Sequence, residues 1–266
     1  MKGFCPLASG SKGNSIFVGS GETKVLIDAG ISARMLTQRL AEIDVDIAEI
    51  DAIVITHEHS DHIRGLGTLA KKWGIPVFAN SDTARAIMET LRAEIKFKIF
   101  STGETFAFGD IEFHPFSIQH DAIDPVGFTL QMGSIKVGFA ADLGFATSLV
   151  KNKLQGCDYL YLEANHQPEM VHACPRPAVY KQRVLGRLGH LSNDQCAELL
   201  REVLHPHLKH VHLAHLSSEC NAPDLAEKIV RGMIEREGSS AEVSIAHQDQ
   251  VSHFAAFDIE KKVLVT

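Results

Sequence analysis

The sequence predicts an α/β protein in which two β-sheets pack against each other and carry helices on their outer faces. Short apolar strands alternate with amphipathic helices along the chain, and the strands gather in two β-rich halves. No linker, low-complexity segment or internal repeat separates the two halves. We therefore expect a single domain over residues 1–266.

The first half begins with strands that glycine turns separate and continues with alternating helices and strands. Gly10, Gly13 and Gly21 mark the turns. Ser32 is the expected N-cap of the first helix, and Ser81 or Asp82 that of the third. We expect strands over residues 4–8, 16–19, 24–27, 52–56 and 77–79. We expect helices over residues 33–43 and 63–73, and a third that ends near Arg92.

The second half opens as a β-meander and returns to alternating helices and strands. Gly133-Ser134 is a tight hairpin turn within the meander. Residues 166–187 contain three prolines, so we expect a loop followed by a short helix. We expect strands over residues 105–108, 111–116, 127–132, 135–140, 159–162, 210–213, 243–245 and 254–257. We expect helices over residues 146–154, 194–203 and 223–236.

The composition is that of an ordinary globular protein with enough apolar residues for a large core. Of 266 residues, 45% are hydrophobic, and the mean hydropathy is near zero. The net charge of −7 argues against a generic basic surface, although it leaves room for a nuclease with a local basic patch. No apolar run is long enough for a membrane span. Five scattered cysteines without C-x-x-C, and no secretory signal, predict a reduced cytoplasmic protein.

The stretch IVITHEHSDH places a dense polar cluster at the end of a buried strand. His57 and His59 fall on the same side of an extended segment because side chains alternate along it. Asp61 and His62 follow at the start of the next helix. Imidazole and carboxylate ligands suit zinc and accept manganese or iron, whereas the same groups buried without a cation would be costly. The cluster therefore predicts a divalent metal site.

Single polar residues follow other predicted strands, as a metal site at the rim of a sheet requires. These residues are Asp28, His120, Asp142 and His215. Two ions roughly 3.5–4 Å apart would need these additional ligands. Any one of them alone could be a cap or surface group, and the two aspartates could be turn formers beside Gly30 and Gly144.

Two further segments suggest contacts with phosphate. On one helix, Arg176, Arg183 and Arg187 would lie near one face, which suits a phosphate backbone, but a solvated helix face explains them as well. ASGSKGNS contains Lys12 between glycines and could present backbone N–H groups to a phosphate. An ordinary hairpin turn is an equal explanation for this segment.

HEHSDH resembles the H-x-H-x-D-H signature of metallo-β-lactamase-fold hydrolases. The resemblance implies an αββα sandwich with two divalent ions, zinc or manganese with iron as a further option. It implies that the first ion is held by His57, His59 and His120. It implies that the second is held by Asp61, His62 and His215, with Asp142 bridging and Asp28 orienting the ligands.

Four further segments narrow the resemblance to the YycJ (WalJ) subfamily, over essentially the whole chain. These segments are LASGSKGNS, HDAIDPVGF, LEANH and GHLSN. The subfamily is associated with 5′-to-3′ exonuclease activity on DNA, so a nucleic acid is the expected partner. LEANH and GHLSN are also similar to two elements of ribonuclease Z, in which a glutamate and a histidine cooperate near the scissile phosphate. The resemblance matches these two residues to Glu163 and His190 of this chain.

The leading expectation is a phosphodiesterase that attacks nucleic acid with a hydroxide held between two metal ions. Asp61 would orient the hydroxide, and His190, polarised by Glu163, would protonate the departing oxygen. His190 could instead be a loop residue before a helix capped by Ser192 or Asn193. Two other functions stay open: a small-molecule hydrolase acting on a cyclic phosphodiester, lactone or thioester, and a non-catalytic metal-binding protein.

Overall fold

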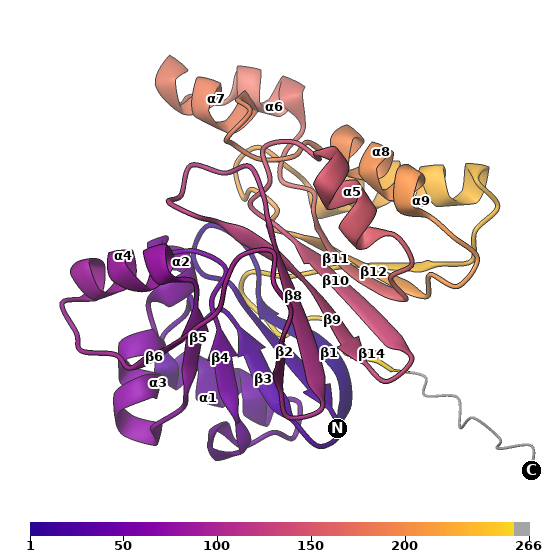
Figure 1. Ribbon diagram of the computed structural model, residues 1–266. Helices are drawn as coiled ribbons and strands as arrows, with labels where there is room; N and C mark the ends of the chain where they lie inside the picture. Colours follow the sequence, from indigo (N-terminus) through magenta and orange to yellow (C-terminus); the bar gives the residue numbers. More distant parts are fainter. Residues whose placement is uncertain (258–266) are drawn as a thin grey trace, which may run out of the picture.

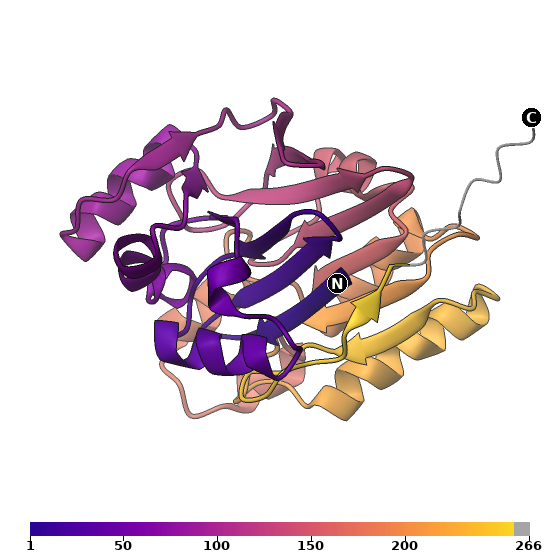
Figure 2. The same ribbon diagram turned by 90° about the horizontal axis from the view of Figure 1, so that it is seen from below.

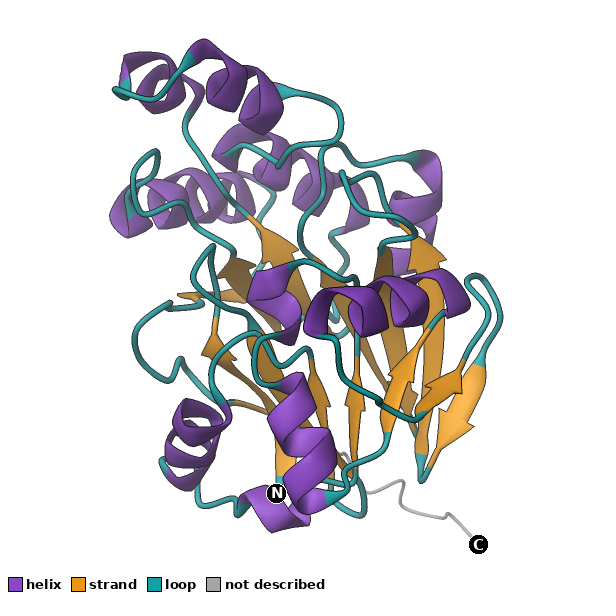
Figure 3. Cartoon of the chain, turned by 90° about the vertical axis from the view of Figure 1, so that its left-hand side faces the viewer, coloured by secondary structure: helices purple, strands orange, loops and turns teal. Residues whose placement is uncertain are grey.

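The computed structural model describes residues 1–257 and confirms the predicted sandwich of two sheets. Residues 258–266 of the expected domain lie outside the described part of the chain. Each sheet contains seven of the described strands, and helices cover the outer faces of both (Figure 1; Figure 3). No helix within residues 1–257 combines the length and apolar character needed to cross a bilayer.

The first sheet has the strand order β14-β1-β2-β3-β4-β5-β6. Strand β2 runs antiparallel to its neighbours β1 and β3, and β3 to β6 run parallel. Figure 2 shows β14 beside β1, so the end of the described chain closes the edge of the sheet built by its beginning. The strands are β1 (Lys2–Ala8), β2 (Ser15–Ser20), β3 (Lys24–Ile27), β4 (Ala52–Val54), β5 (Val77–Ala79), β6 (Phe97–Ile99) and β14 (Ala255–Ala256).

The second sheet has the order β13-β12-β11-β10-β9-β8-β7. Strands β7 to β10 form an antiparallel meander, and β10 to β13 are parallel. The strands are β7 (Phe106–Phe108), β8 (Ile111–Ser117), β9 (Val126–Met132), β10 (Ile135–Ala140), β11 (Tyr159–Glu163), β12 (His210–Ala214) and β13 (Glu242–Ile245).

Helices pack on each sheet through one apolar face. On the first sheet, Leu36 of α1 and Leu69 of α3 share a buried cluster with strand residues such as Leu26. On the second, Leu200 of α8 and Val230 of α9 pack with the strands in the same way. The helices of these two layers are α1 (Ala33–Ala41), α2 (Ser60–Ile63), α3 (Leu66–Trp73), α4 (Ser81–Leu91), α5 (Ser148–Leu154), α8 (Asn193–Val203) and α9 (Pro223–Arg236).

Alternation along the strands builds a third apolar layer between the sheets. Val25 and Ile27 of β3 face this layer, whereas Leu26 between them faces the helices. Phe113 and Phe128 come from the second sheet and are completely buried there. Burial of such a side chain contributes about 1.5–3 kcal/mol to the free energy of folding. This layer fixes the two sheets relative to each other and therefore fixes the rim where they meet.

Several local expectations differ from the structure. The predicted helix over residues 63–73 begins only at Leu66, and Ile63 ends the separate short helix α2. Between the two helices, the Gly65 amide donates to the Ala29 carbonyl at 2.8 Å. The N-cap of α4 is Asn80, whose side chain accepts from the Thr83 amide. Strand β6 was missed although residues 95–99 alternate apolar side chains with lysines; the strand itself is only three residues long and largely exposed. A 3-10 turn, η1 (Ile47–Glu49), precedes β4.

The proline-containing segment holds two short helices rather than one. They are α6 (Pro168–Ala173) and α7 (Ala178–Leu185), which stand together at the top of Figure 1. Pro175 and Pro177 lie between them, where proline disfavours a continuous helix. The predicted helix with Arg176, Arg183 and Arg187 on one face is therefore wrong, since only Arg183 lies within α7.

Candidate metal centre

The candidate metal centre lies where strands from both sheets reach their carboxyl ends. Asp28 follows β3, and His57 comes three residues after the end of β4. Asp142 follows β10, and His215 follows β12 directly. Parallel strands deliver their carboxyl ends to one edge, which is the usual place for a site in α/β sheets. The strands thus bring together residues that are far apart in the sequence.

Three of these residues adopt a backbone conformation that bends the chain sharply after the strand. Asp28, Asp142 and His215 have φ angles of 60°, 56° and 54°. The left-handed region is sparsely populated by residues other than glycine and costs on the order of 1–3 kcal/mol. Its repeated use at the same rim shows that the surrounding structure holds these side chains in place against a local cost.

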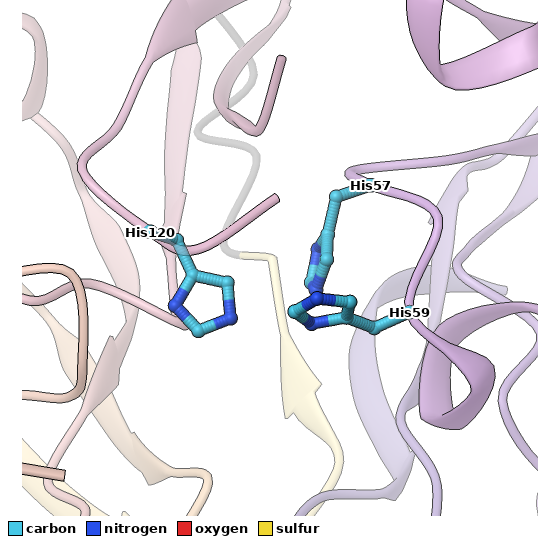
Figure 4. Close-up of side chains that lie close together, drawn as sticks. All are labelled: His57, His59 and His120. Atoms are coloured by element: carbon cyan, nitrogen blue, oxygen red, sulfur yellow. The ribbon is translucent and has the colours of Figure 1, made fainter. Parts of the chain in front are cut away.

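His57, His59 and His120 form the first group of potential ligands. One ligand atom of each lies within 4.8 Å of the others. Their ring centroids are 4.7–5.2 Å apart. Figure 4 shows His57 and His59 coming from one loop and His120 reaching toward them from the opposite side. The structure therefore assembles all three residues that the sequence assigned to a first ion.

Asp61, His62 and His215 form the second group, again with ligand atoms within 4.8 Å of one another. Asp142 lies between the two groups. Its Oδ2 is 3.2 Å from His62 Nε2, and its Oδ1 is 3.8 Å from His120 Nε2. Asp142 thus lies beside one residue of each group, and the bridging role that the resemblance implies for it stays a prediction.

The hydrogen bonds of the buried histidines are compatible with the tautomer that metal binding needs. In that tautomer each ring donates from Nδ1 to an oxygen and keeps Nε2 as the ligand atom. For His62 the acceptor is Asp28 Oδ2, at 2.7 Å. The other Nδ1 atoms donate to Thr56 Oγ1 from His57 (2.9 Å), to the Gly189 carbonyl from His120 (3.2 Å) and to Glu163 Oε1 from His215 (2.9 Å). Nε2 of each ring is thus the nitrogen available to an ion, and Nε2 of His62 also lies 3.1 Å from Asn14 Nδ2.

Several of the converging atoms are buried without a hydrogen-bond partner among residues 1–257. They include His57 Nε2, His215 Nε2 and Asp142 Oδ2. The last of these lies 3.2 Å from His62 Nε2. Such a set of nitrogen and oxygen donors fits divalent cations, and burial without a cation would be unfavourable.

The pKa shifts of His215 and Asp142 show how strongly the buried carboxylates of the centre attract positive charge. Burial lowers the pKa of His215, but Asp142 and Asp61 outweigh burial and raise it to about 10. Burial raises the pKa of Asp142, but the neighbouring His215 and His62 hold it well below its usual range. Protons on these histidines therefore balance the buried carboxylates. A divalent cation can take the place of those protons.

Asp28 lies behind the ligands, as the sequence prediction required. Its Oδ2 accepts from His62 Nδ1 and from the Thr56 hydroxyl at 2.8 Å, and its Oδ1 accepts from the Thr56 amide at 2.8 Å. Asp28 is buried, so these contacts hold one ring of the second group and the end of β4 together.

Glu163 is completely buried and contacts both sides of the centre. Its Oε1 accepts from His190 Nδ1 at 2.8 Å and from His215 Nδ1 at 2.9 Å. Its Oε2 accepts from the backbone amides of Leu143 and Leu191. Burial raises the pKa of Glu163, but His190 and His215 outweigh it and lower the pKa to about 2. The carboxylate thus orients His190 and one candidate ligand at once.

The three arginines predicted to contact phosphate are engaged with protein groups. Arg183 makes a bidentate pair with Asp121, at 2.6 and 3.0 Å, beside His120. Arg176 pairs with Glu219 farther away along the chain, and the Arg187 guanidinium lies 4.4 Å from the Phe145 ring centroid. Lys12 is exposed in the loop after β1. The structure brings only Arg183 of the three arginines into the neighbourhood of the metal groups.

Sequence reasoning missed two asparagines at the centre. Asn14 Nδ2 lies 3.3 Å from Asp61 Oδ2, and the Asn14 amide donates to the Asp61 carbonyl. Asn165 Nδ2 donates to the His215 carbonyl at 2.6 Å. Both lie inside segments that the sequence singled out, ASGSKGNS and LEANH, so those segments were the available signal.

The comparison with known proteins agrees with this architecture. A family model for the beta-lactamase superfamily domain matches residues 23–215. An exodeoxyribonuclease YycJ of Bacillus anthracis is 38% identical over 88% of this chain and 90% of its own length. An exodeoxyribonuclease WalJ of Streptococcus pneumoniae is 38% identical over 83% of each chain.

Structural similarity extends the same result to the fold. The metallo-beta-lactamase fold protein YhfI of Bacillus subtilis superposes with a TM-score of 0.70, at 19% identity, over 93% of this chain and 97% of YhfI. The chain therefore belongs to the beta-lactamase superfamily of metal-dependent hydrolases, and within it to the family of the exodeoxyribonucleases YycJ and WalJ.

Proposed function

We propose that this protein is a metal-dependent phosphodiesterase that digests DNA from the 5′ end as an exonuclease. The observation that carries the proposal is a single buried site in which both metal groups adjoin the Glu163–His190 pair. The names of the YycJ and WalJ relatives, which match over more than four fifths of the chain, support the reaction and the substrate. We propose as well that residues 1–266 form one domain, because ligands from both sheets build the site.

We propose two ions, zinc or manganese, at the two groups. His57, His59 and His120 would hold one, Asp61, His62 and His215 the other, and Asp142 would contact both. Such ions lower the pKa of water toward neutrality and neutralise charge on a phosphodiester. The chain's own contribution is rigidity: Asp28 and Glu163 hold rings of the second group from behind.

His190 is the proposed proton donor. Its Nδ1 donates to Glu163, which leaves Nε2 as the ring nitrogen that can hand a proton to the departing sugar oxygen. The carboxylate behind the ring fixes its orientation through Nδ1. Ser192 caps α8 and its side chain accepts from the Gln195 amide, as the alternative role of His190 as a loop residue also expects. The contact of His190 with Glu163 is what supports the catalytic role.

Arg183 is the basic group best placed to meet a phosphate of the substrate. Its partner Asp121 follows His120 directly, and both groups of the pair are partly exposed. A phosphate could take over the bidentate contact that the carboxylate now makes.

All five cysteines are buried and unpaired, which supports a reducing, cytoplasmic compartment.

End-labelled substrates test the proposal directly. Protein loaded with manganese or zinc should release nucleotides from the 5′ end of DNA, and this activity should fall steeply as salt rises. The same protein is given RNA and a chromogenic bis-phosphodiester. Turnover of the small ester without cleavage of any polymer would assign a small-molecule hydrolase instead. Absence of all turnover, with metal bound, would leave a non-catalytic metal-binding protein.

A further inference from the structure

A second cluster of histidines lies at the other end of β12, away from the candidate metal centre. His210 begins the strand and His215 follows it, so the two lie about 16 Å apart at about 3.3 Å per residue. Val211 and Leu213 face the helices, and Ala214 faces the layer between the sheets. His210 and His212 alternate with Val211 and Leu213, so they lie on the same side of the strand as Ala214. They place two imidazoles at the edge of the otherwise apolar layer between the sheets.

Strand register connects these histidines to polar residues on β13. His210 pairs with Glu242 and His212 with Ser244. Ser244 Oγ lies 2.8 Å from His210 Nε2 and 2.7 Å from His212 Nδ1, so it links the two rings. His210 Nδ1 is left facing Glu242 Oε2 at 3.5 Å. His253, just before β14, stacks on His210 with ring centroids 5.1 Å apart and an interplanar angle of 15°.

The geometry of this cluster suits a metal ion better than a direct ion pair. The ligand atoms of His210, Glu242 and His253 all lie within 4.8 Å of one another. A separation of 3.5 Å is long for a charge-assisted hydrogen bond. Two ligands about 2.1 Å from a tetrahedral zinc ion lie about 3.4 Å apart, which is close to that separation.

The surroundings favour the ligand form of His210. A hydrogen bond from Nε2 to Ser244 Oγ, passed on to His212 Nδ1, leaves His210 Nδ1 with a lone pair toward Glu242. A surface cavity of about 560 Å³, lined in part by the three candidate ligands, gives an ion and water access.

We infer that His210, Glu242 and His253 form a further binding site for a first-row divalent ion, best matched by zinc. Two imidazoles and one carboxylate with an open position are a common zinc ligand set. The site would join the edges of the two sheets. His210 and Glu242 belong to the second sheet, whereas His253 leads into β14 of the first, which pairs with β1 through only two residue pairs. The ion would anchor this short strand.

Zinc stoichiometry tests the site without reference to catalysis. Full-length protein is stripped of metal, dialysed against low micromolar free zinc and analysed for bound zinc. His253→Ala and Glu242→Gln should each bind one equivalent less per chain than the wild type. The matched control is His207→Ala, which removes an exposed histidine of the same cavity and should keep the wild-type stoichiometry. Equal zinc in the wild type and in both variants would overturn the site.

Hydrogen exchange tests the anchoring role. In the wild type, zinc should slow amide exchange in residues 246–257 by at least tenfold, and in His253→Ala it should not. Circular dichroism verifies that the variants are folded. Nuclease activity should be kept by His253→Ala, since this residue is outside the candidate metal centre, so failure of one proposal does not imply failure of the other. Equal protection in the wild type and His253→Ala would overturn the anchoring role.

Discussion

The two sheets supply the candidate metal centre in different ways. The first sheet gives four potential ligands within the six positions from His57 to His62, all on the loop and helix start after β4. The second sheet gives single residues, His120, Asp142 and His215, each at the end of a different strand. The ligands from the first sheet are close together in the sequence. Those from the second sheet come close together only when the sheet has formed.

The difference assigns different tasks to the two halves. The concentrated ligands can approach an ion with little help from the rest of the fold, because local alternation and a helix start already bring them together. The distributed residues determine how the groups are joined. Asp142 lies between them, and Glu163 connects His215 to His190. We therefore expect changes in the second sheet to cost more activity than equivalent changes behind the first.

The largest effect is expected from Asp142→Asn. The substitution removes a charge that both groups share, so bound metal should decrease and kcat should fall by more than about 10³-fold, which corresponds to several kcal/mol of lost stabilisation. Metal analysis and exonuclease assays measure both quantities. Asp44→Asn is the matched control, because Asp44 is an exposed aspartate in the same left-handed conformation. Full metal content and activity in Asp142→Asn would refute its bridging role.

The Glu163–His190 pair should have the next largest effect. His190→Gln should lower kcat by about 10²–10⁴-fold with little change in bound metal, as expected for a proton donor. Glu163→Gln should lower kcat and also weaken metal binding, since Glu163 orients His215. The double variant should be little slower than the slower single variant, because the two residues act as a unit. Fully additive losses would contradict the pairing.

Asp28→Asn tests the support behind the first sheet. The loss of its charge behind His62 should weaken metal affinity by about 10–100-fold, while saturating metal restores most of kcat. Competition with a chelator measures the affinity. Asp110→Asn is a suitable control, because Asp110 is an aspartate hydrogen-bonded to Ser20 and is not among the candidate metal ligands. An unchanged affinity in Asp28→Asn would show that His62 needs no such support.

The last effect concerns stability after metal removal rather than activity. The pKa of Glu163 is lowered to about 2, so its contribution to stability is complete above its ordinary value of 4.5 and is lost as the pH falls through about 2. The pKa of His215 is raised to about 10, so its contribution is complete below 6.5 and is lost as the pH rises through about 10. Both contributions are complete only between about pH 4.5 and 6.5.

Denaturant unfolding of metal-stripped protein checks this window. The wild type should exceed Glu163→Gln in unfolding free energy by about 3 kcal/mol at most within the window, and the difference should shrink on either side. Glu198→Gln, an exposed glutamate of α8, should follow the wild type at every pH. A difference that stays constant from pH 3 to pH 9 would show that the pair contributes no pH-dependent stability.

The sequence was most informative where the chemistry is local. The helix over residues 223–236 was predicted with the observed bounds, since a proline at its start and periodic apolar residues mark it. The ligand segment after β4 was visible because its four potential ligands lie within six positions of the sequence. The predicted α/β sandwich was confirmed, because strand alternation already separates residues that face helices from those that face the other sheet.

Long-range placement was less accessible to sequence reasoning. The arginines that seemed to share a helix are separated by prolines, and each found a different partner: Glu219, Asp121 or the Phe145 ring. The roles of Asn14 and Asn165 depend on loops that meet only at the rim. The polar cluster around His210 required the register between β12 and β13. None of these contacts is encoded by spacing along the chain.

The sequence by itself determined the layered fold and the presence of a metal-binding loop, because both depend on periodicity and on neighbours within a few residues. Only the tertiary structure decided which distant groups face one another: Asp142 between two groups of histidines, Glu163 shared by His190 and His215, and His253 of one sheet edge against His210 of the other. The reason is physical. Hydrogen bonds and metal coordination act over about 2–3 Å, and the packing of the two sheets sets those distances.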